Sequence, residues 1–489
     1  MTRLRLDPAM HSPITPDWPG ASWVGAVDEF ALARAVGSVG SAGSSTSAGF
    51  VAECVDATGY TRARLLVRRG ADIRGFVDVA LADGCLDLAD LSARVALLPP
   101  PAPRLEPVPD PGKLPTFTVL VCTRDRAALL RSALLSVLAL DYPHFEVLVV
   151  DNAAATPETR DLLANEFAGR VRRIEEPVPG LSRARNTGLR NALGEFVAFT
   201  DDDVTVDPYW LRGLAAGFAR GDDVECVAGL VPSGELRTAV QAFFDDRVSW
   251  SRNLSPRHFS LSDPPKDLPM FPFSVGEFGT GANFAIRRGY ALEIGGFDTA
   301  FGVGTRTGGG EDLDIFTRVI LDGRGLVVEP SALVWHRHRD DLAALRYQAR
   351  GYGTGLGAWL TKIALRPRTA WLALRRSPTA LVHLFRKGGG ALPDSGERMP
   401  AAASATDAAL RREITRVGWY ELACVARGPW AYLRQRWSGE KRPGSGNPEP
   451  AAHSPAHSPA QFRGSPRGRA DASGVLTAPV RDAETGAAS

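Results

Sequence analysis

Three consecutive carboxylates follow an apolar run in the stretch VAFTDDDVTV, residues 197–206. Two like unit charges about 4 Å apart repel by about 4 kcal/mol at an effective dielectric of about 20, so Asp201, Asp202 and Asp203 require compensation. Most adjacent aspartates lie in solvated turns, whereas a divalent cation such as Mg²⁺ or Mn²⁺ takes carboxylate oxygens as ligands. Apolar residues resume directly after the triplet, which favours the cation.

A second group of acids stands at the start of an expected helix in GGGEDLDIFTRV, residues 308–319. The apolar residues that follow recur at helical spacing, which puts Glu311 and Asp312 in the first turn. The helix dipole favours acids there by about 0.3–1 kcal/mol, so the position alone requires no function. The same field keeps Asp312 ionised, as a base that accepts a hydroxyl proton must be. Asp314 is a reserve candidate on another helix face.

Alternating strands and helices after Pro115 must position these acids. We expect strands at 116–123, 145–152, 171–175 and 195–203, with helices at 129–138, 158–167 and 182–194, the last one closed by Gly194. This βαβ series predicts an open α/β sheet, whose ligands bind beyond the carboxyl ends of the strands. Three polar groups, at Thr123–Asp125, Asp151–Asn152 and Asp201–Asp203, stand at such ends.

The chain divides into five predicted segments by composition and pattern. Residues 1–98 form a small accessory α+β domain with a β-hairpin that turns near Gly70, and 99–115 form a Pro-rich linker. Residues 116–345 carry the α/β core, 346–437 a basic helical segment, and 438–489 a tail whose composition predicts disorder.

Overall composition restricts the classes of protein that fit. An apolar fraction of 44% in 489 residues supports substantial cores, and a formal charge of +2 argues against a nucleic-acid-binding protein. The five cysteines are scattered, which is typical of a reducing compartment. The N-terminal sequence lacks a secretory signal, and no apolar run has the length of a spanning helix. We therefore expect a cytoplasmic protein, or one on the cytoplasmic face of a membrane.

Seven stretches in sequential order resemble family 2 glycosyltransferases with the GT-A fold, a Rossmann-like and mostly parallel α/β sheet. They are TFTVLVCTRDRAALLRSALLSVL, FEVLVVDN, GLSRARNTGLRNALGEFVAFTDDDV, GTGANFAIRR, GGFD, GGGEDLDIFTRV and VWHRHR, within residues 116–340. The resemblance implies an enzyme that transfers a sugar from a nucleotide-sugar donor, expected to be a UDP-sugar, with inversion at the anomeric carbon. It further implies Mg²⁺ or Mn²⁺ as cofactor, a glycan or lipid-linked acceptor, and a place in the synthesis of cell-surface polysaccharide, glycolipid or glycoconjugate.

The resemblance also implies residue roles. Asp201 and Asp203 match the family's DxD acids that hold the metal, Asp201 also facing the ribose, and His336 matches the remaining metal ligand. The other matches are Thr123, Asp125 and Asp151 at the nucleobase and ribose, Arg185 at the phosphates, Asn283 at the donor sugar and acceptor, Asp312 as inverting base, and Glu311 at the acceptor. Family members often carry Asn at the position of Asp125, and an acid at the position of Asn152.

The histidines of VWHRHR allow a second interpretation. The spacing His336-x-His338 is compatible with zinc, but no cysteine or third histidine stands nearby in the sequence. On an extended chain, His338 is expected to point away from His336.

Residues 346–388 mix arginine and lysine with tryptophan, leucine and phenylalanine and contain almost no acid. Such a segment suits peripheral contact with anionic lipid, and equally suits a helical cap with a solvated basic face. The sequence leaves both open.

Two other functions compete with glycosyl transfer. A nucleotidylyltransferase would carry a glycine-rich loop after the first strand, and CTRDRAALL has no glycine. A non-catalytic module that binds sugar nucleotides, or a membrane-associated scaffold, would have lost one of Asp203, Asp312 and His336, and all three are present.

Overall fold

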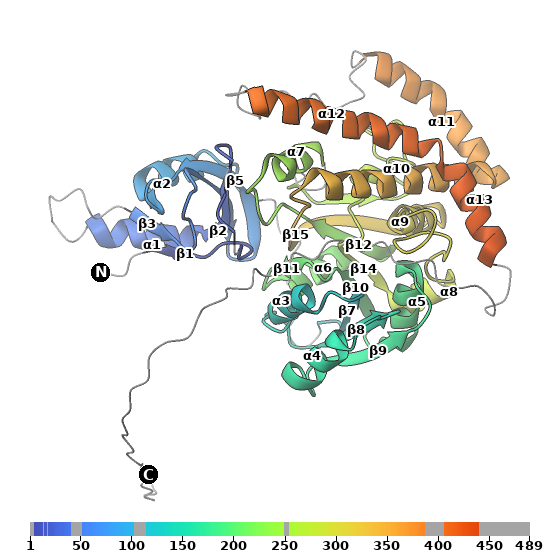
Figure 1. Ribbon diagram of the computed structural model, residues 1–489, viewed down its shortest axis with the longest axis horizontal. Coiled ribbons are helices and arrows are strands. Elements are labelled where there is room, and N and C mark those ends of the chain that lie inside the picture. The colour runs from blue at the N-terminus through green and yellow to red at the C-terminus, as the bar shows by residue number, and fades with distance from the viewer. Residues whose placement is uncertain are drawn as a thin grey trace, which may run out of the picture. The chain divides into compact units, whose positions relative to one another are not determined.

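The computed structural model describes residues 4–12, 14–16, 18–40, 51–101, 114–248, 254–386 and 405–439. Within these ranges the alternating pattern after Pro115 builds one nine-stranded sheet, whose strands are coloured from teal through green to yellow in Figure 1. Most of the expected linker at 99–115 and nearly all of the expected tail at 438–489 lie outside the described residues.

The strand order of the large sheet is β11-β15-β12-β14-β10-β7-β8-β9, with β13 also paired to β15. The strands are β7 (Phe117–Thr123), β8 (Phe145–Asn152), β9 (Arg172–Glu176), β10 (Phe196–Thr200), β11 (Val204–Val206), β12 (Val224–Leu230), β13 (Arg257–Phe259), β14 (Asn283–Arg287) and β15 (Gly325–His336). Strands β10, β7, β8 and β9 run parallel, while β14 is antiparallel to both β10 and β12. The carboxyl ends of the parallel strands therefore share one edge of the sheet.

Helices cover both faces of this sheet because its central strands are apolar on both sides. On one face lie α3 (Ala127–Val137), α4 (Glu158–Glu166) and α6 (Trp210–Phe218). On the other lie α5 (Leu181–Asn191), α8 (Arg288–Glu293) and α9 (Glu311–Leu321). The expected α/β fold is confirmed, and strand and helix positions agree to within a few residues.

Gly194 does not close a helix, contrary to our expectation. Helix α5 ends at Asn191, and Gly194 follows in the connection to β10. A Cβ atom at Gly194 would lie 2.4 Å from the Thr118 backbone nitrogen. The glycine is thus explained by close approach to β7, and sequence alone does not distinguish this from a helix cap.

Before the large sheet, the described residues form two three-stranded sheets with helices and a core of their own. The elements are β1 (Arg5–Leu6), β2 (Trp23–Asp28), α1 (Glu29–Gly40), β3 (Val51–Cys54), β4 (Arg62–Arg69), β5 (Asp72–Ala80), β6 (Cys85–Asp87) and α2 (Leu88–Ala96). Strands β4 and β5 pair as the expected hairpin, with Arg69 opposite Asp72 and Gly70 at a φ of 61°.

Long helices follow the large sheet: α10 (Leu342–Ala364), α11 (Pro367–Arg386), α12 (Ala405–Val425) and α13 (Gly428–Gly439). Glycines of α10 allow backbone contact, since a Cβ at Gly357 would lie 2.0 Å from the Val425 carbonyl oxygen of α12. The short helix α7 (Ala239–Arg247) shares an apolar cluster with α10 and α12. Among the helices that the structure describes, none combines the length and the apolar character needed to cross a bilayer.

Candidate active site

The acidic triplet occupies the turn between two strands. Strand β10 ends at Thr200 and β11 begins at Val204, so Asp201, Asp202 and Asp203 stand at the carboxyl edge of the sheet. Strand β11 pairs antiparallel with β15, and Val204 lies opposite His336. This pairing brings His336 Nε2 to 3.3 Å from Asp203 Oδ1, although the two residues are far apart in sequence.

These residues fit a divalent cation. One ligand atom from each of Asp201, Asp203 and His336 lies within 4.8 Å of the others. Two ligands about 2.1 Å from an ion, at right angles, are about 3 Å apart, close to the separation of Asp203 and His336. Two carboxylates and an imidazole suit Mn²⁺, and the carboxylates suit Mg²⁺. Among the described residues, Asp201, Asp203 and His336 are the acidic and histidine side chains whose ligand atoms are spaced as metal ligands are.

Arg126, at the start of α3, supplies much of the charge that the triplet requires. Its Nη1 donates to Asp202 Oδ1 over 2.5 Å and its Nη2 to Asp203 Oδ2 over 2.8 Å. Asp202 also accepts a hydrogen bond of 2.7 Å from the Thr123 hydroxyl. Burial raises the pKa of Asp202 to about 7, against the opposing effects of Arg126 and Thr123. Asp202 therefore anchors the end of β7 to the triplet, a structural role that sequence did not assign.

Asp203 is the most strongly acidic member of the triplet. Burial by itself would raise its pKa, but the positive charge and hydrogen bond of His336, together with Arg126, hold the pKa well below the usual value. Arg339 adds a further charge, with Nη1 4.0 Å from Asp203 Oδ2 and a side chain that is 44% exposed. Asp203 is thus ionised at neutral pH, as a metal ligand must be.

Arg185 connects the triplet to the acids at the start of α9. Its guanidinium is buried and lies 3.5 Å from Asp201 Oδ1 and 3.3 Å from Glu311 Oε1. It also donates to the Gly281 carbonyl over 2.9 Å. The structure therefore brings Asp201 and Glu311, which we predicted to serve the donor and the acceptor, to the two sides of one cation.

Helix α9 begins as expected, with Glu311 and Asp312 in its first turn after Gly310 at a φ of 89°. Asp312 Oδ2 accepts from the Gly281 amide over 3.0 Å, and Oδ1 accepts from the Leu313 amide over 2.8 Å. These two bonds fix the orientation of the carboxylate and leave each oxygen a second lone pair. Glu311 Oε2 is buried without a hydrogen-bond partner.

Glu311 should make stability depend on pH. Burial, and then the charge of Asp312, raise its pKa to about 7 from 4.5. Between these values the folded state binds more protons than the unfolded chain, so stability falls as pH rises through this window. We expect the wild type to lose on the order of 2 kcal/mol relative to Glu311→Gln from about pH 5 to about pH 8. Denaturant unfolding of both proteins measures this, and parallel pH curves would contradict it.

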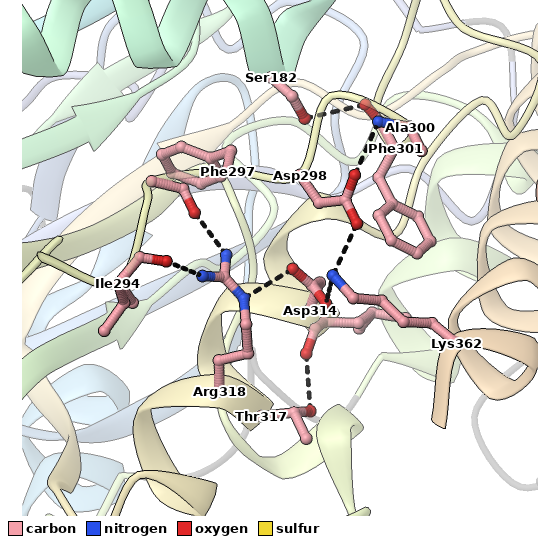
Figure 2. Close-up of polar contacts among 12 residues, drawn as sticks. Ser182, Ile294, Phe297, Asp298, Ala300, Phe301, Asp314, Thr317, Arg318 and Lys362 are labelled. Carbon is pink, nitrogen blue, oxygen red and sulfur yellow. Dashed lines mark hydrogen bonds and ion pairs between the residues drawn. The ribbon is translucent and has the colours of Figure 1, made fainter. Parts of the chain in front are cut away.

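Asp314, the reserve candidate, belongs to a buried structural network. Figure 2 shows Asp314 between Arg318 and Lys362, with Lys362 also reaching Asp298. Lys362 Nζ lies 2.6 Å from Asp314 Oδ1 and 2.7 Å from Asp298 Oδ2, and Arg318 Nε donates to Asp314 over 2.8 Å. Because two cations engage the carboxylate of Asp314, Asp312 is the better candidate for a base.

Lys362→Met should destabilise the fold by about 3–5 kcal/mol, since it removes the buried cation that Asp314 and Asp298 share. Lys362 is 5% exposed and joins α10 to α9 through Asp314. Chemical denaturation gives the free energy of unfolding. The matched control is Arg366→Met, an exposed residue just beyond the same helix, which should change it by less than about 0.5 kcal/mol. Equal effects of the two substitutions would contradict the role of the network.

The nucleotide side of the predicted site contains an unsatisfied buried atom. Asp151, at the end of β8, accepts from Arg173 through Oδ2 over 2.8 Å, whereas its buried Oδ1 has no partner. Asp125 Oδ1 instead accepts from the amides of Ala155 and Thr156, over 2.8 and 3.1 Å. Thus Asp151 retains an acceptor for a ligand, while Asp125 holds the loop after β8.

Two expectations about individual side chains need correction. Asn283 is fully buried, accepts from the Trp210 indole over 2.7 Å, and donates to the carbonyls of Leu230 and Ala332. The side chain is enclosed in the core and its oxygen and nitrogen both bond to core elements, so it is not available to a donor sugar. His338 does not point away from His336, because β15 ends at His336; their Nδ1 atoms are 3.1 Å apart.

Sequence reasoning missed three residues near the acids. Arg126 pairs with Asp203, and Arg339 lies at the edge of the same cluster. Tyr352, on α10, lies close enough to Asp312 for that charge to contribute to the rise in its pKa, after the larger effect of burial. Arg126 follows directly after Thr123–Asp125, the polar group at a predicted strand end. This position could have indicated that Arg126 lies near the acids.

Comparison with known proteins supports one family. The family model for Glycosyl transferase family 2 matches residues 118–295. The chain is 30% identical over 268 residues to the pre-mycofactocin glycosyltransferase of Mycobacterium tuberculosis, covering 54% of this chain and 52% of that protein. It is 31% identical over 262 residues to the succinoglycan biosynthesis protein ExoM of Rhizobium meliloti, covering 51% of this chain and 77% of that protein.

A mannosyltransferase from Pyrobaculum calidifontis, solved with GDP-Man and Mn²⁺, aligns with 67% of this chain and 91% of its own at 22% identity and a TM-score of 0.42. The chain spans about half the length of the mycobacterial relative. The matched motifs, the identity to ExoM and the mixed α/β sheet agree, and the chain belongs to glycosyl transferase family 2, with the GT-A fold.

Proposed function

We propose that this protein is an inverting glycosyltransferase that moves a sugar from a nucleoside-diphosphate sugar to an acceptor hydroxyl with the help of Mg²⁺ or Mn²⁺. The observation that carries the proposal is the placement of Asp201 and Glu311 on the two sides of buried Arg185. One acid belongs to the candidate metal cluster and the other to the helix start that carries Asp312. A donor site and an acceptor site thus meet within one cluster of side chains.

On the donor side, Asp201, Asp203 and His336 would hold the cation. When bound, the cation neutralises charge that develops on the departing diphosphate. Arg339 is exposed and close to Asp203, so its guanidinium can bind the same phosphates. Asp151 Oδ1, buried and unpartnered, suits a donor hydrogen on the nucleobase or ribose. A UDP-sugar is the expected donor.

On the acceptor side, Asp312 is the proposed base. The amides of Gly281 and Leu313 donate to its two carboxylate oxygens and fix its orientation. It takes the proton from the acceptor hydroxyl as the oxygen attacks the anomeric carbon from the face opposite the leaving diphosphate, which inverts the configuration. Glu311, whose Oε2 is unpartnered, would accept a hydrogen bond from a second acceptor hydroxyl.

The acceptor is proposed to be a glycan or a lipid-linked glycan, and the product a polysaccharide, glycolipid or glycoconjugate. The similarity to a pre-mycofactocin glycosyltransferase and to a succinoglycan biosynthesis protein supports this class. Contact of the 346–388 segment with anionic lipid belongs to the same proposal. It is supported by Trp371 and Leu374 of α11, which are 58% and 71% exposed beside Arg375. Sedimentation with anionic vesicles, against neutral vesicles, tests this contact.

A thermal-shift screen tests the proposed donor reaction. The full chain is heated with UDP-, GDP- and dTDP-sugars, with and without Mn²⁺. Because a ligand that binds only the folded state raises the melting temperature, one nucleotide should stabilise the protein, and only with metal. Stabilisation without any metal dependence would favour the alternative of a sugar-nucleotide-binding module, and no response to any donor would contradict the proposal.

A further inference from the structure

A hollow with an unusual lining lies between α10 and α12, apart from the cluster of acids. It has a volume of about 460 Å³ and is lined by Arg346, Tyr347, Arg350, Arg416 and Tyr420. Three arginines and two tyrosines therefore line one cavity. None of these residues has a role in the donor or base chemistry proposed above.

The charge in this hollow is only partly compensated. Glu413 accepts from Arg346 over 2.6 Å and also pairs with Arg416. Among the described residues, no carboxylate pairs with Arg350. Three cations against one anion leave a net positive charge at an exposed surface, which attracts an anion. Guanidinium groups bind phosphate oxygens with paired hydrogen bonds, and tyrosine rings stack on sugar rings.

Helix α10 links the hollow to the predicted active site. It begins six residues after His336, and Tyr347 lies one turn before Gly351 on the same helix face. At Gly351 a Cβ would lie 2.9 Å from the Gly308 carbonyl oxygen, so α10 packs directly against the loop that leads to Glu311 and Asp312. One helix therefore contributes both to the hollow and to the packing of the loop before Asp312.

We propose that this hollow binds a phosphate group of the acceptor, and that it selects acceptors in which a phosphorylated sugar lies a short distance from the reacting hydroxyl. That the ligand is an acceptor rests on the proposed transferase function. Binding of phosphate in the hollow does not depend on that function. Arg350 and Arg416 bind the phosphate oxygens, and Tyr347 packs against the attached sugar.

Calorimetric titration of the full chain with pyrophosphate, in EDTA so that no metal occupies the acidic cluster, tests the site. Arg350→Gln and Arg416→Gln should each weaken binding by about tenfold. The matched control is Arg434→Gln, which removes an exposed arginine of α13 and should change affinity less than about twofold. Equal loss in all three variants, or no binding by the wild type, would overturn the site.

A second measurement separates this inference from the proposed function. With the donor that the thermal-shift screen selects, Arg350→Gln should raise KM for phosphorylated acceptors about tenfold and leave kcat, donor KM and the slow hydrolysis of donor unchanged. If transfer occurs but KM is unchanged for phosphorylated and unphosphorylated acceptors, the hollow is not an acceptor site, and the transferase proposal stands. If pyrophosphate binds but no donor is turned over, the transferase proposal fails while the phosphate site remains.

Discussion

Asp312→Asn is expected to lower the rate of glycosyl transfer by about 10²–10⁴-fold, the usual contribution of a positioned general base. The substitution preserves the shape of the side chain, and the amide oxygen can still accept one of the two bonds from Gly281 and Leu313. Asparagine cannot take up the proton of the acceptor hydroxyl. Because Asp312 lies on the acceptor side of Arg185, donor affinity should change less than about threefold.

Steady-state kinetics with saturating acceptor measure this loss, and titration with donor and Mn²⁺ measures the affinity. Glu311→Gln is the matched control, since Glu311 stands beside Asp312 in the same helical turn. It should raise the acceptor KM more than it lowers kcat, because it removes a binding contact and no proton acceptor. The opposite result would contradict this assignment. If Glu311→Gln lowered kcat by about 10²–10⁴-fold and Asp312→Asn remained active, Glu311 would be the base.

Asp203→Asn is expected to weaken Mn²⁺ binding by at least about 10²-fold and to abolish metal-dependent donor binding. Asp203 contributes the charge nearest to His336, and its pKa is held well below the usual value by that histidine and Arg126 despite burial. An amide in its place lowers the negative charge available to a cation. Arg126 retains Asp202 as its partner, so the turn itself should persist.

Mn²⁺ titration followed by electron paramagnetic resonance measures this effect on the protein alone, without donor or turnover. The control is Asp141→Asn, an aspartate that is 59% exposed and pairs with Arg212 on the surface. Its Mn²⁺ affinity should equal that of the wild type. Unchanged Mn²⁺ affinity in Asp203→Asn would place the metal elsewhere and would remove the basis for the donor side of the site.

The strands and helices of the large sheet were predictable because burial dictates their pattern. Strand β8 is an almost continuous apolar run that ends in Asp151 and Asn152, and such a run fits a strand buried on both faces. The same regularity locates the strand ends, and hence the acids. Helix α9 was predictable from its apolar stripe, which also fixes Glu311 and Asp312 at its first turn.

Side-chain roles were less predictable because they depend on contacts between distant segments. Asn283 sits in a motif that resembles a ligand-binding stretch, yet its amide joins Trp210 to core backbone. His338 was misassigned because strand alternation was extended past the end of β15. Arg126 pairs with Asp202 across 76 positions, and no local pattern reports such a contact.

The anomeric configuration of the first product tests the central claim most directly. Proton NMR during early turnover of an α-linked nucleotide sugar with Mn²⁺ should show transfer with formation of the β anomer, because the proposed base Asp312 would direct the acceptor to the face opposite the diphosphate. Chelation of the metal should stop product formation. An α product under the same conditions, or transfer that continues in EDTA, would contradict the assignment of Asp312, Asp201, Asp203 and His336 to one metal-assisted inverting site.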